Sequence, residues 1–287
     1  YGASDGSSVI GIACDFDNQT FYYYYNNTLV DTATISSVSY DGTATNVTYQ
    51  EATKFTPDLV WIKRRSSTED HAWFDSVRGV QRQISSNLTA VGYTTTNAVS
   101  SFDSTGFTTG NNGATNASGH TYVAWCFNAG TGSAVSNTDG DITSTVKANT
   151  AAGFSIVSYS GNNASSATIG HGLNSAPELI FTKARNFGAG WPTMVKTASA
   201  SLYGLRLNSS SANDAGNGSV FYNNTAPTAS VYTVGGSDEI NDGYNYISYC
   251  FHSVNGYQKI GTYTGTGASG VEVETGFEPA FLMIKNT

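Results

Sequence analysis

The sequence predicts an all-β protein made of tandem β-sandwich or jelly-roll-like domains in an elongated array. A proline-led apolar segment occurs three times along the chain, and the motifs on either side of it recur in the same order. Only 12% of the 287 residues are charged, which argues against a solvated, disordered chain. Abundant aromatic and β-branched residues, separated by Gly and Asn turns, are typical of short strands.

The three copies of the proline-led segment are PDLVWIK (57–63), PELIFTK (177–183) and PAFLMIK (279–285). In each copy the lysine follows the proline by six positions. An apolar run of this length between a proline and a charged residue is too short for a helix, and it predicts a strand that is buried on both faces. Proline is tolerated at the start of such a strand, where its missing N–H group costs least.

The flanking motifs turn this repeated strand into a repeated domain. Tyr40, Tyr159 and Tyr263 precede the three prolines by 17, 18 and 16 residues. The segment TYVAWCF (121–127) of the first unit returns as NYISYCF (245–251) in the second. The spacings of 119 and 104 residues between the tyrosines suit domains with their own cores better than solenoid turns. We predict four segments, namely the C-terminal part of a β-sandwich (1–35), repeat unit 1 (36–152), repeat unit 2 (153–255) and the start of unit 3 (256–287).

Charge and hydropathy exclude several classes of partner. The net charge is −8 with only 13 Lys and Arg, which gives no basic footprint for nucleic acid or an anionic membrane. No run of 18 apolar residues occurs, so no membrane insertion is expected. The chain begins at Tyr1 and stops inside a strand pattern, so we expect it to be a window cut from a longer polypeptide.

Three cysteines, Cys14, Cys126 and Cys250, each lie in an apolar strand-like run. We interpret them as reduced core residues, because free cysteine packs as a small hydrophobic side chain. Reduced cysteines are typical of a protein that folds in a reducing cytosol.

The first part of the chain predicts a β-hairpin, with strands at Val9–Phe16 and Phe21–Tyr25 around a polar turn. Its motif IGIACDFDNQTFYYYYNN resembles the SPRY family of concanavalin-like β-sandwiches over about the first 35 residues. Tyr23 and Tyr25 point to one face of their strand and form a candidate sugar-stacking platform. Packing of these rings within a core or on a sheet face is the favoured alternative.

Several side chains invite a catalytic or metal-binding interpretation. The residue types of a hydrolase triad occur close together in Ser66, Asp70 and His71. The second repeat has no equivalent of these residues, and the sequence has no nucleophile elbow, so we do not expect a triad. The adjacent acids Asp238 and Glu239 should point to opposite faces of a strand, so they do not form a glycosidase pair. The sequence predicts neither an enzyme nor a cofactor.

Two further candidates concern ligand and metal binding. Trp73 and Trp191 follow the organising strand at similar places in the two repeats, which favours a shared structural aromatic residue over ligand stacking. Asp139 and Asp141 flank a glycine and are candidate calcium ligands, because calcium prefers hard oxygen donors. A linker turn is the favoured interpretation of that segment.

The combination of PDLVWIK, FDSVRG, SFDSTGFTTG, TYVAWCF, NTDGDITSTV and GFSIVSY resembles the repeated domain of tail-fibre and other appendage proteins of marine tailed bacteriophages. The resemblance covers nearly the whole chain. It implies a virion structural protein that folds in the host cytoplasm, forms a homo-oligomer such as a trimer or filament, and contacts a bacterial surface glycan. It carries no catalytic residues.

Two functions from different classes therefore stay open. The array is either a host-recognition fibre that binds surface glycan through aromatic side chains in loops, or a filament, spacer or capsid-decoration subunit without a ligand of its own. Exposed aromatic clusters favour the first function, and aromatic residues buried between chains favour the second. The host, the receptor, the place on the particle and the oligomeric state are not encoded in any motif that we identify.

Overall fold

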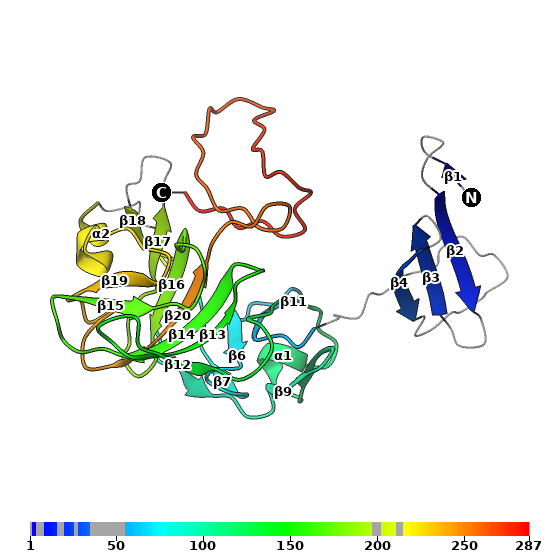
Figure 1. Cartoon of the computed structure of the whole chain (residues 1–287). Coiled ribbons are helices and arrows are strands. Elements are labelled where there is room, and N and C mark those ends of the chain that lie inside the picture. The colour runs from blue at the N-terminus through cyan, green and yellow to red at the C-terminus, as the bar shows by residue number, and fades with distance from the viewer. Residues whose placement is uncertain are drawn as a thin grey trace. The chain divides into compact units, whose positions relative to one another are not determined.

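The computed structural model describes strands at 2–3, 9–15, 20–25 and 28–34, and residues 55–196, 202–210 and 215–286. The chain divides into two compact units, Tyr1–Lys54 and Phe55–Thr287. The first contains four antiparallel strands in the order β1-β2-β3-β4 (Figure 1). They are β1 (Gly2–Ala3), β2 (Val9–Asp15), β3 (Thr20–Tyr25) and β4 (Thr28–Thr34). The predicted hairpin is confirmed, since Ile10 of β2 lies opposite Tyr25 of β3.

The second unit begins with the organising strand of the first repeat. That strand, β5 (Leu59–Arg64), lies between β11 (Tyr122–Phe127) and β6 (Ala72–Asp75) in a three-stranded antiparallel sheet. The segment between β6 and β11 forms two small hairpins and one short helix, whose first turn is capped by the Asn112 side chain accepting from the Ala114 N–H. These elements are β7 (Arg82–Gln83), β8 (Tyr93–Thr94), β9 (Val99–Asp103), β10 (Gly106–Thr109) and α1 (Gly113–Asn116).

A seven-stranded antiparallel sheet follows, in the order β12-β13-β14-β20-β16-β17-β18. Its strand β20, orange in Figure 1, lies between the green strands β14 and β16, although it comes last in the chain. A separate pair, β15 (Ser166–Gly170) with β19 (Val231–Gly235), and helix α2 (Ala215–Tyr222) pack on the same unit. The seven strands are β12 (Val135–Asn137), β13 (Ser144–Asn149), β14 (Phe154–Ser160), β16 (Leu179–Ala184), β17 (Pro192–Lys196), β18 (Leu202–Arg206) and β20 (Asn245–Phe251).

The sequence repeat is confirmed in the pairing of the strands. In the first repeat Val60 of β5 lies opposite Cys126 of β11, and in the second Ile180 of β16 lies opposite Cys250 of β20. Each organising strand also pairs on its other side with the next strand along the chain, β6 or β17. The two repeats therefore share one three-strand arrangement in the same register.

The third copy differs from the other two. Residues 279–285 contain no strand, and Leu282 and Ile284 are 65% and 68% exposed. Their counterparts in the first repeat, Val60 and Ile62, are buried between the three-stranded sheet and the elements that cover it. The motif alone is therefore insufficient to form a strand, because a strand needs neighbours for its N–H and C=O groups.

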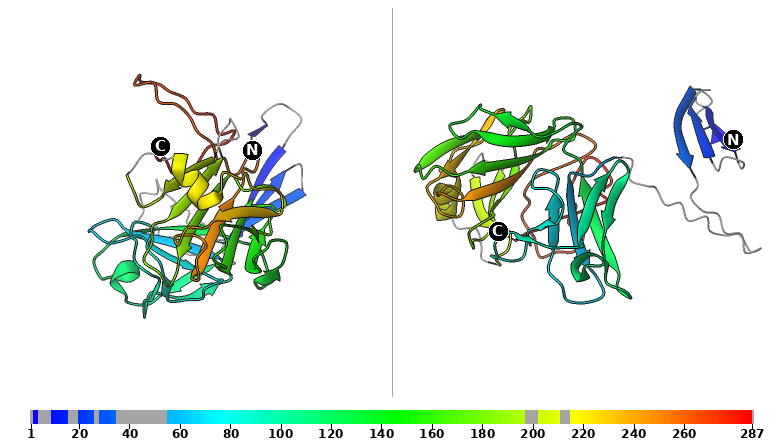
Figure 2. Two further views of the ribbon diagram at one scale, coloured as in Figure 1. Left: turned by 90° about the vertical axis from the view of Figure 1, so that its left-hand side faces the viewer. Right: turned by 90° about the horizontal axis from the view of Figure 1, so that it is seen from below.

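The matching faces of the two repeats pack against each other in one shared core. Trp73 of the first repeat makes T-shaped contacts with three rings of the second, at centroid distances of 5.1 to 6.1 Å. These rings are Phe181, Trp191 and Tyr249, and Trp61 of the first repeat belongs to the same cluster. Figure 2 shows the cyan strands of the first repeat beside the green and orange sheet of the second. Aromatic rings bury large apolar areas, so this contact joins the two layers.

This shared core replaces the elongated array expected from the sequence. The structure shows no tandem array in its described part, because residues 55–287 form one compact unit. Moreover β12 and β13, which precede the predicted division at 152/153, belong to the same sheet as β14. The spacing of the motifs indicated a duplication, but not that the copies bury their aromatic faces on one another.

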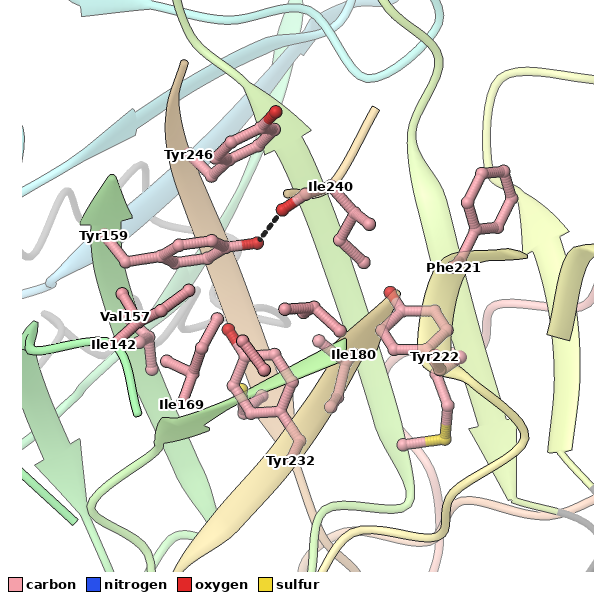
Figure 3. Close-up of a cluster of buried hydrophobic side chains, with 14 of the residues drawn as sticks. Ile142, Val157, Tyr159, Ile169, Ile180, Phe221, Tyr222, Tyr232, Ile240 and Tyr246 are labelled. Carbon is pink, nitrogen blue, oxygen red and sulfur yellow. Dashed lines mark hydrogen bonds between the residues drawn. The ribbon is translucent and has the colours of Figure 1, made fainter. Parts of the chain in front are cut away.

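The opposite face of each repeat has a core of its own. In the first repeat, Val60, Ile62 and Phe74 pack under the β9–β10 hairpin and α1. In the second, the sheet packs under α2 and the β15–β19 pair, where the Tyr159 hydroxyl donates to the Ile240 carbonyl at 2.8 Å (Figure 3). The Tyr159 ring also stacks on Tyr246 with centroids 5.1 Å apart. The fold is thus two sheets with a common centre and two outer cores.

Candidate functional site

In the first two copies, an acidic residue follows the repeated proline and holds the loop after the cysteine-bearing strand, β11 or β20. Asp58 Oδ2 accepts a hydrogen bond from the Ala129 N–H at 2.8 Å, and Glu178 Oε2 accepts one from the Ser253 N–H at 2.7 Å. The third copy has Ala280 in this position. These two carboxylates are therefore structural groups of the repeat, already committed to backbone donors.

The repeated lysine holds the hairpin loop after the organising strand. Lys63 Nζ donates to the Glu69 carbonyl at 2.7 Å, and Lys183 Nζ donates to the Ala189 carbonyl at 2.9 Å. Lys183 also reaches the Thr89 carbonyl of the first repeat at 3.3 Å. Burial lowers the pKa of Lys183 to about 8, while Glu239 acts in the opposite direction.

Buried ion pairs add polar ties between the two layers. The Arg78 guanidinium pairs with Asp75, and the Tyr249 hydroxyl of the second repeat donates to Asp75 Oδ2 at 2.7 Å. Lys147 of β13 reaches Asp58 Oδ1 at 2.6 Å. Burial raises the pKa of Tyr249 well above its ordinary value, so this hydroxyl keeps its proton and remains a donor.

A surface groove lies where loops of both repeats meet. It consists of two adjoining depressions, of about 390 and 540 Å³, which share Asn208 and Ser209. Both are open depressions on the surface and not enclosed cavities. The first depression is also lined by Trp61, His71, Ser86, Asn87, Leu207, Ser210 and Met283, and the second by Thr89, Phe187, Gly188, Ala189, Gly190, Arg206, Asp238 and Glu239.

A fixed hydrogen-bond network positions the polar residues of the first depression. His71 Nδ1 accepts a hydrogen bond from the Trp61 indole N–H at 2.7 Å. The backbone N–H of His71 donates to Asn87 Oδ1 at 3.0 Å. Asn87 in turn donates to Asp70 Oδ1 at 2.6 Å. Burial, together with nearby Lys63, lowers the pKa of His71 against the opposing effect of Asp70. The imidazole is therefore neutral at pH 7, and with Nδ1 accepting, its proton is on Nε2.

The second depression combines charge with an aromatic side chain. Arg206 donates through Nε and Nη2 to both oxygens of Glu239, at 2.6 to 3.2 Å. The Phe187 ring stacks almost flat on Tyr244, with centroids 4.5 Å apart and an interplanar angle of 10°. With the Asp238 side chain also lining this depression, its acids outnumber its single arginine.

The structure places the predicted stacking tryptophans in the shared core. Trp73 is 1% exposed and Trp191 is 0% exposed, and their rings meet at 5.2 Å. Trp191 also donates its indole N–H to the Ser85 carbonyl at 3.0 Å. Neither ring can stack on a ligand, so that candidate role is wrong for this structure. The other two predicted stacking residues, Tyr23 and Tyr25, lie in β3, and their side chains are outside the described part of the chain.

The candidate calcium residues form a turn against strand β15. Asp141 Oδ2 accepts from the backbone N–H and the hydroxyl of Thr168 at 2.9 and 2.8 Å, and Asp139 bonds to Asn137. Gly140 lies so close to the Thr168 carbonyl that no Cβ would fit. Among the described residues, no group of three or more His, Cys, Asp or Glu is placed to hold a metal ion.

The residue types of a hydrolase triad are not brought together. Ser66 Oγ lies 3.0 Å from His120 Nδ1, while His71 bonds to Trp61 and Asp70 bonds to Asn87. The expectation for Asp238 and Glu239 was wrong in detail. Both lie in the turn after β19 rather than on a strand, and both line the second depression.

One comparison with known proteins identifies a family. A family model for a domain of unknown function, DUF7483, matches residues 32–287. The chain belongs to the DUF7483 family. No curated protein matches the chain, and no solved structure matches it. The DUF7483 match begins within β4 and includes both repeats, the shared core and the groove.

Sequence reasoning missed the groove of this DUF7483 domain. Asn208 and Ser209 follow β18, in a stretch without any repeated motif, and Phe187 belongs to a loop whose only signal was its aromatic character. Both repeats supply the hairpin loop that follows the organising strand, but these loops have unrelated sequences, with His71 in the first and Phe187 to Gly190 in the second. No repeated motif therefore marks the groove. Of the described helices, none has the length and apolar character needed to cross a membrane.

Proposed function

We propose that this chain is a virion structural protein, part of a tail fibre or similar phage appendage that positions a contact with the bacterial surface. The observation that carries the proposal is the duplicated three-strand unit whose aromatic faces pack on one another around Trp73. Such a body resists deformation, because a close-packed core transmits strain and does not yield to it. The resemblance of the motifs to phage appendage repeats gives the biological setting.

The polar ties between the layers support the same proposal. Asp75, Arg78 and Tyr249 join the first repeat to the second within the protein interior, and Lys147 to Asp58 adds another link. Buried ion pairs contribute little net stability, but breaking one is costly. They fix one arrangement of the layers, which is a property that an appendage under mechanical force needs.

Immunogold electron microscopy tests this proposal. Antibodies raised against the purified chain should label an appendage on virions of the phage that encodes it. The matched control is the same serum after absorption with the chain. Label confined to infected-cell debris, with none on purified particles, would overturn the proposal.

A filament or spacer subunit is the second candidate function, and the C-terminal segment favours it. Leu282 and Ile284 present apolar side chains to solvent, as do Val271 and Val273 of the same C-terminal segment. Apolar residues gathered on a surface mark contacts with other chains. Sedimentation analysis separates the two candidates, since a spacer forms long polymers without any host-surface ligand and a recognition fibre forms a closed oligomer.

A further inference from the structure

We propose that the groove is a carbohydrate-binding site for an uncharged saccharide, and the proposal rests on the surface-contact role proposed above. The groove lies between loops of both repeats and contains side chains from each, such as Asn87 and Asn208. Neither residue belongs to a repeated motif or to the shared core. Each accepts a hydrogen bond from a backbone N–H group, so both amide side chains are held at the groove by the fold.

The polar groups of the groove are held in place before any ligand binds. Asn87 is fixed by Asp70 and by the backbone of His71, and Asn208 Oδ1 accepts from the Trp191 N–H at 2.9 Å. Side chains that are already ordered lose little rotamer entropy when a ligand arrives. Amide and imidazole groups of this kind can exchange hydrogen bonds with the hydroxyl groups of a sugar.

Apolar surface alternates with these polar groups. Trp61, Leu207 and Met283 line the first depression, and Phe187, held flat against Tyr244, lines the second. A pyranose ring has one face of C–H groups and a rim of hydroxyl groups. It therefore needs apolar and hydrogen-bonding surface side by side, which is what the groove offers along its length.

The charges in the groove select against acidic sugars. His71 in the first depression is neutral at pH 7, since burial lowers its pKa. In the second, Arg206 is already paired with Glu239, and the buried Lys183 ammonium, which donates to the Thr89 and Ala189 carbonyls of the lining, offsets the exposed Asp238. A carboxylate or phosphate on the ligand would find no excess of positive charge in the groove, and both cations there already have partners, so the expected ligand is neutral.

Saturation-transfer NMR and calorimetry on the whole chain test the proposal. The probes are maltotriose, mannotriose and tri-N-acetylglucosamine, with trigalacturonate as the acidic comparison. At least one neutral trisaccharide should bind with a Kd of about 1 mM or tighter, and trigalacturonate should not bind. Silence from all three neutral trisaccharides would overturn the proposal, and so would equal binding of trigalacturonate.

Matched variants locate the site. Ser210→Trp and Thr89→Trp place a large side chain at exposed positions in the first and second depressions, and Ser133→Trp makes the same change at an exposed position outside both. Binding should fall at least tenfold in Ser210→Trp or Thr89→Trp and stay unchanged in Ser133→Trp. Unchanged binding in both groove variants would overturn the assignment. If the antibodies described above label virions but no saccharide binds, the carbohydrate site is refuted and the proposed structural function is not.

Discussion

Lys183 Nζ donates a 2.9 Å hydrogen bond to the carbonyl of Ala189, six residues further along the chain. The first repeat reproduces this contact, with Lys63 Nζ and the Glu69 carbonyl 2.7 Å apart and the two residues again six positions apart. A lysine that the sequence marks only as the end of an apolar run is thus the group that fixes the following hairpin loop. In the second repeat that loop includes part of the groove.

The stability of the protein should rise with pH because of Lys183. Burial lowers the pKa of this lysine from 10.5 to about 8, so between these values the unfolded chain binds more protons than the folded one. Stability increases with pH wherever the unfolded state binds more protons, and from pH 7 to pH 9.5 the gain is about 2 kcal/mol. Urea unfolding of the native chain and Lys183→Met at both pH values measures it.

The variant Lys183→Met should lose this pH-dependent gain, and Lys259→Met, which removes an exposed lysine, should keep it. An identical pH dependence in the native chain and Lys183→Met would show that Lys183 is not held charged in a desolvated position.

Truncating Trp191 should destabilise the protein strongly. The ring is fully buried between the two repeats and touches Trp73, so Trp191→Ala leaves a large cavity and should cost about 3 to 5 kcal/mol. Phe281→Ala is the comparison, because Phe281 touches Trp61 and Trp125 but is 37% exposed, so its loss should cost less, about 1 kcal/mol. Chemical denaturation measures both, and similar losses would contradict the placement of Trp191 at the centre of the fold.

Breaking the buried ion pair should also be costly. Asp75→Asn removes the charge that faces Arg78 and should destabilise the chain by about 3 to 5 kcal/mol, because the guanidinium is then left buried without its partner. Glu69→Gln removes the partner of Arg64 in a more exposed pair at 3.6 Å and should cost at most about 1 kcal/mol. If the two variants have similar denaturation midpoints, Asp75 is accessible to water.

Part of this fold could be predicted from the sequence, because short segments carry the signals for individual strands. In the first two copies the proline, the apolar run and the lysine mark a short buried strand, as predicted. The recurrence of TYVAWCF as NYISYCF marks a second strand in each repeat, whose pairing with the first is seen only in the structure. The relation between the repeats was beyond such reasoning. Alternation along a strand assigns Leu59 and Trp61 to one face, but it does not tell what that face meets.

The candidate site was harder still to predict. Trp73 and Trp191 attracted a ligand-binding interpretation because large aromatic residues serve both cores and sugar sites, and only their burial against each other decides between these roles. The groove depends on tertiary contacts of Asn87 and Asn208 that no spacing reveals. In the third copy, the same motif without neighbouring strands forms no strand at all.

Amide hydrogen exchange on Trp73→Ala tests whether the two repeats fold around one core. Trp73 lies on β6 of the first repeat and contacts Tyr249 on β20 of the second. With a shared core, the variant should lose exchange protection in β20 as well as in β5, by about the same free energy. Loss of protection confined to β5, β6 and β11, with β20 unchanged, would show that the repeats are independent domains without a shared core.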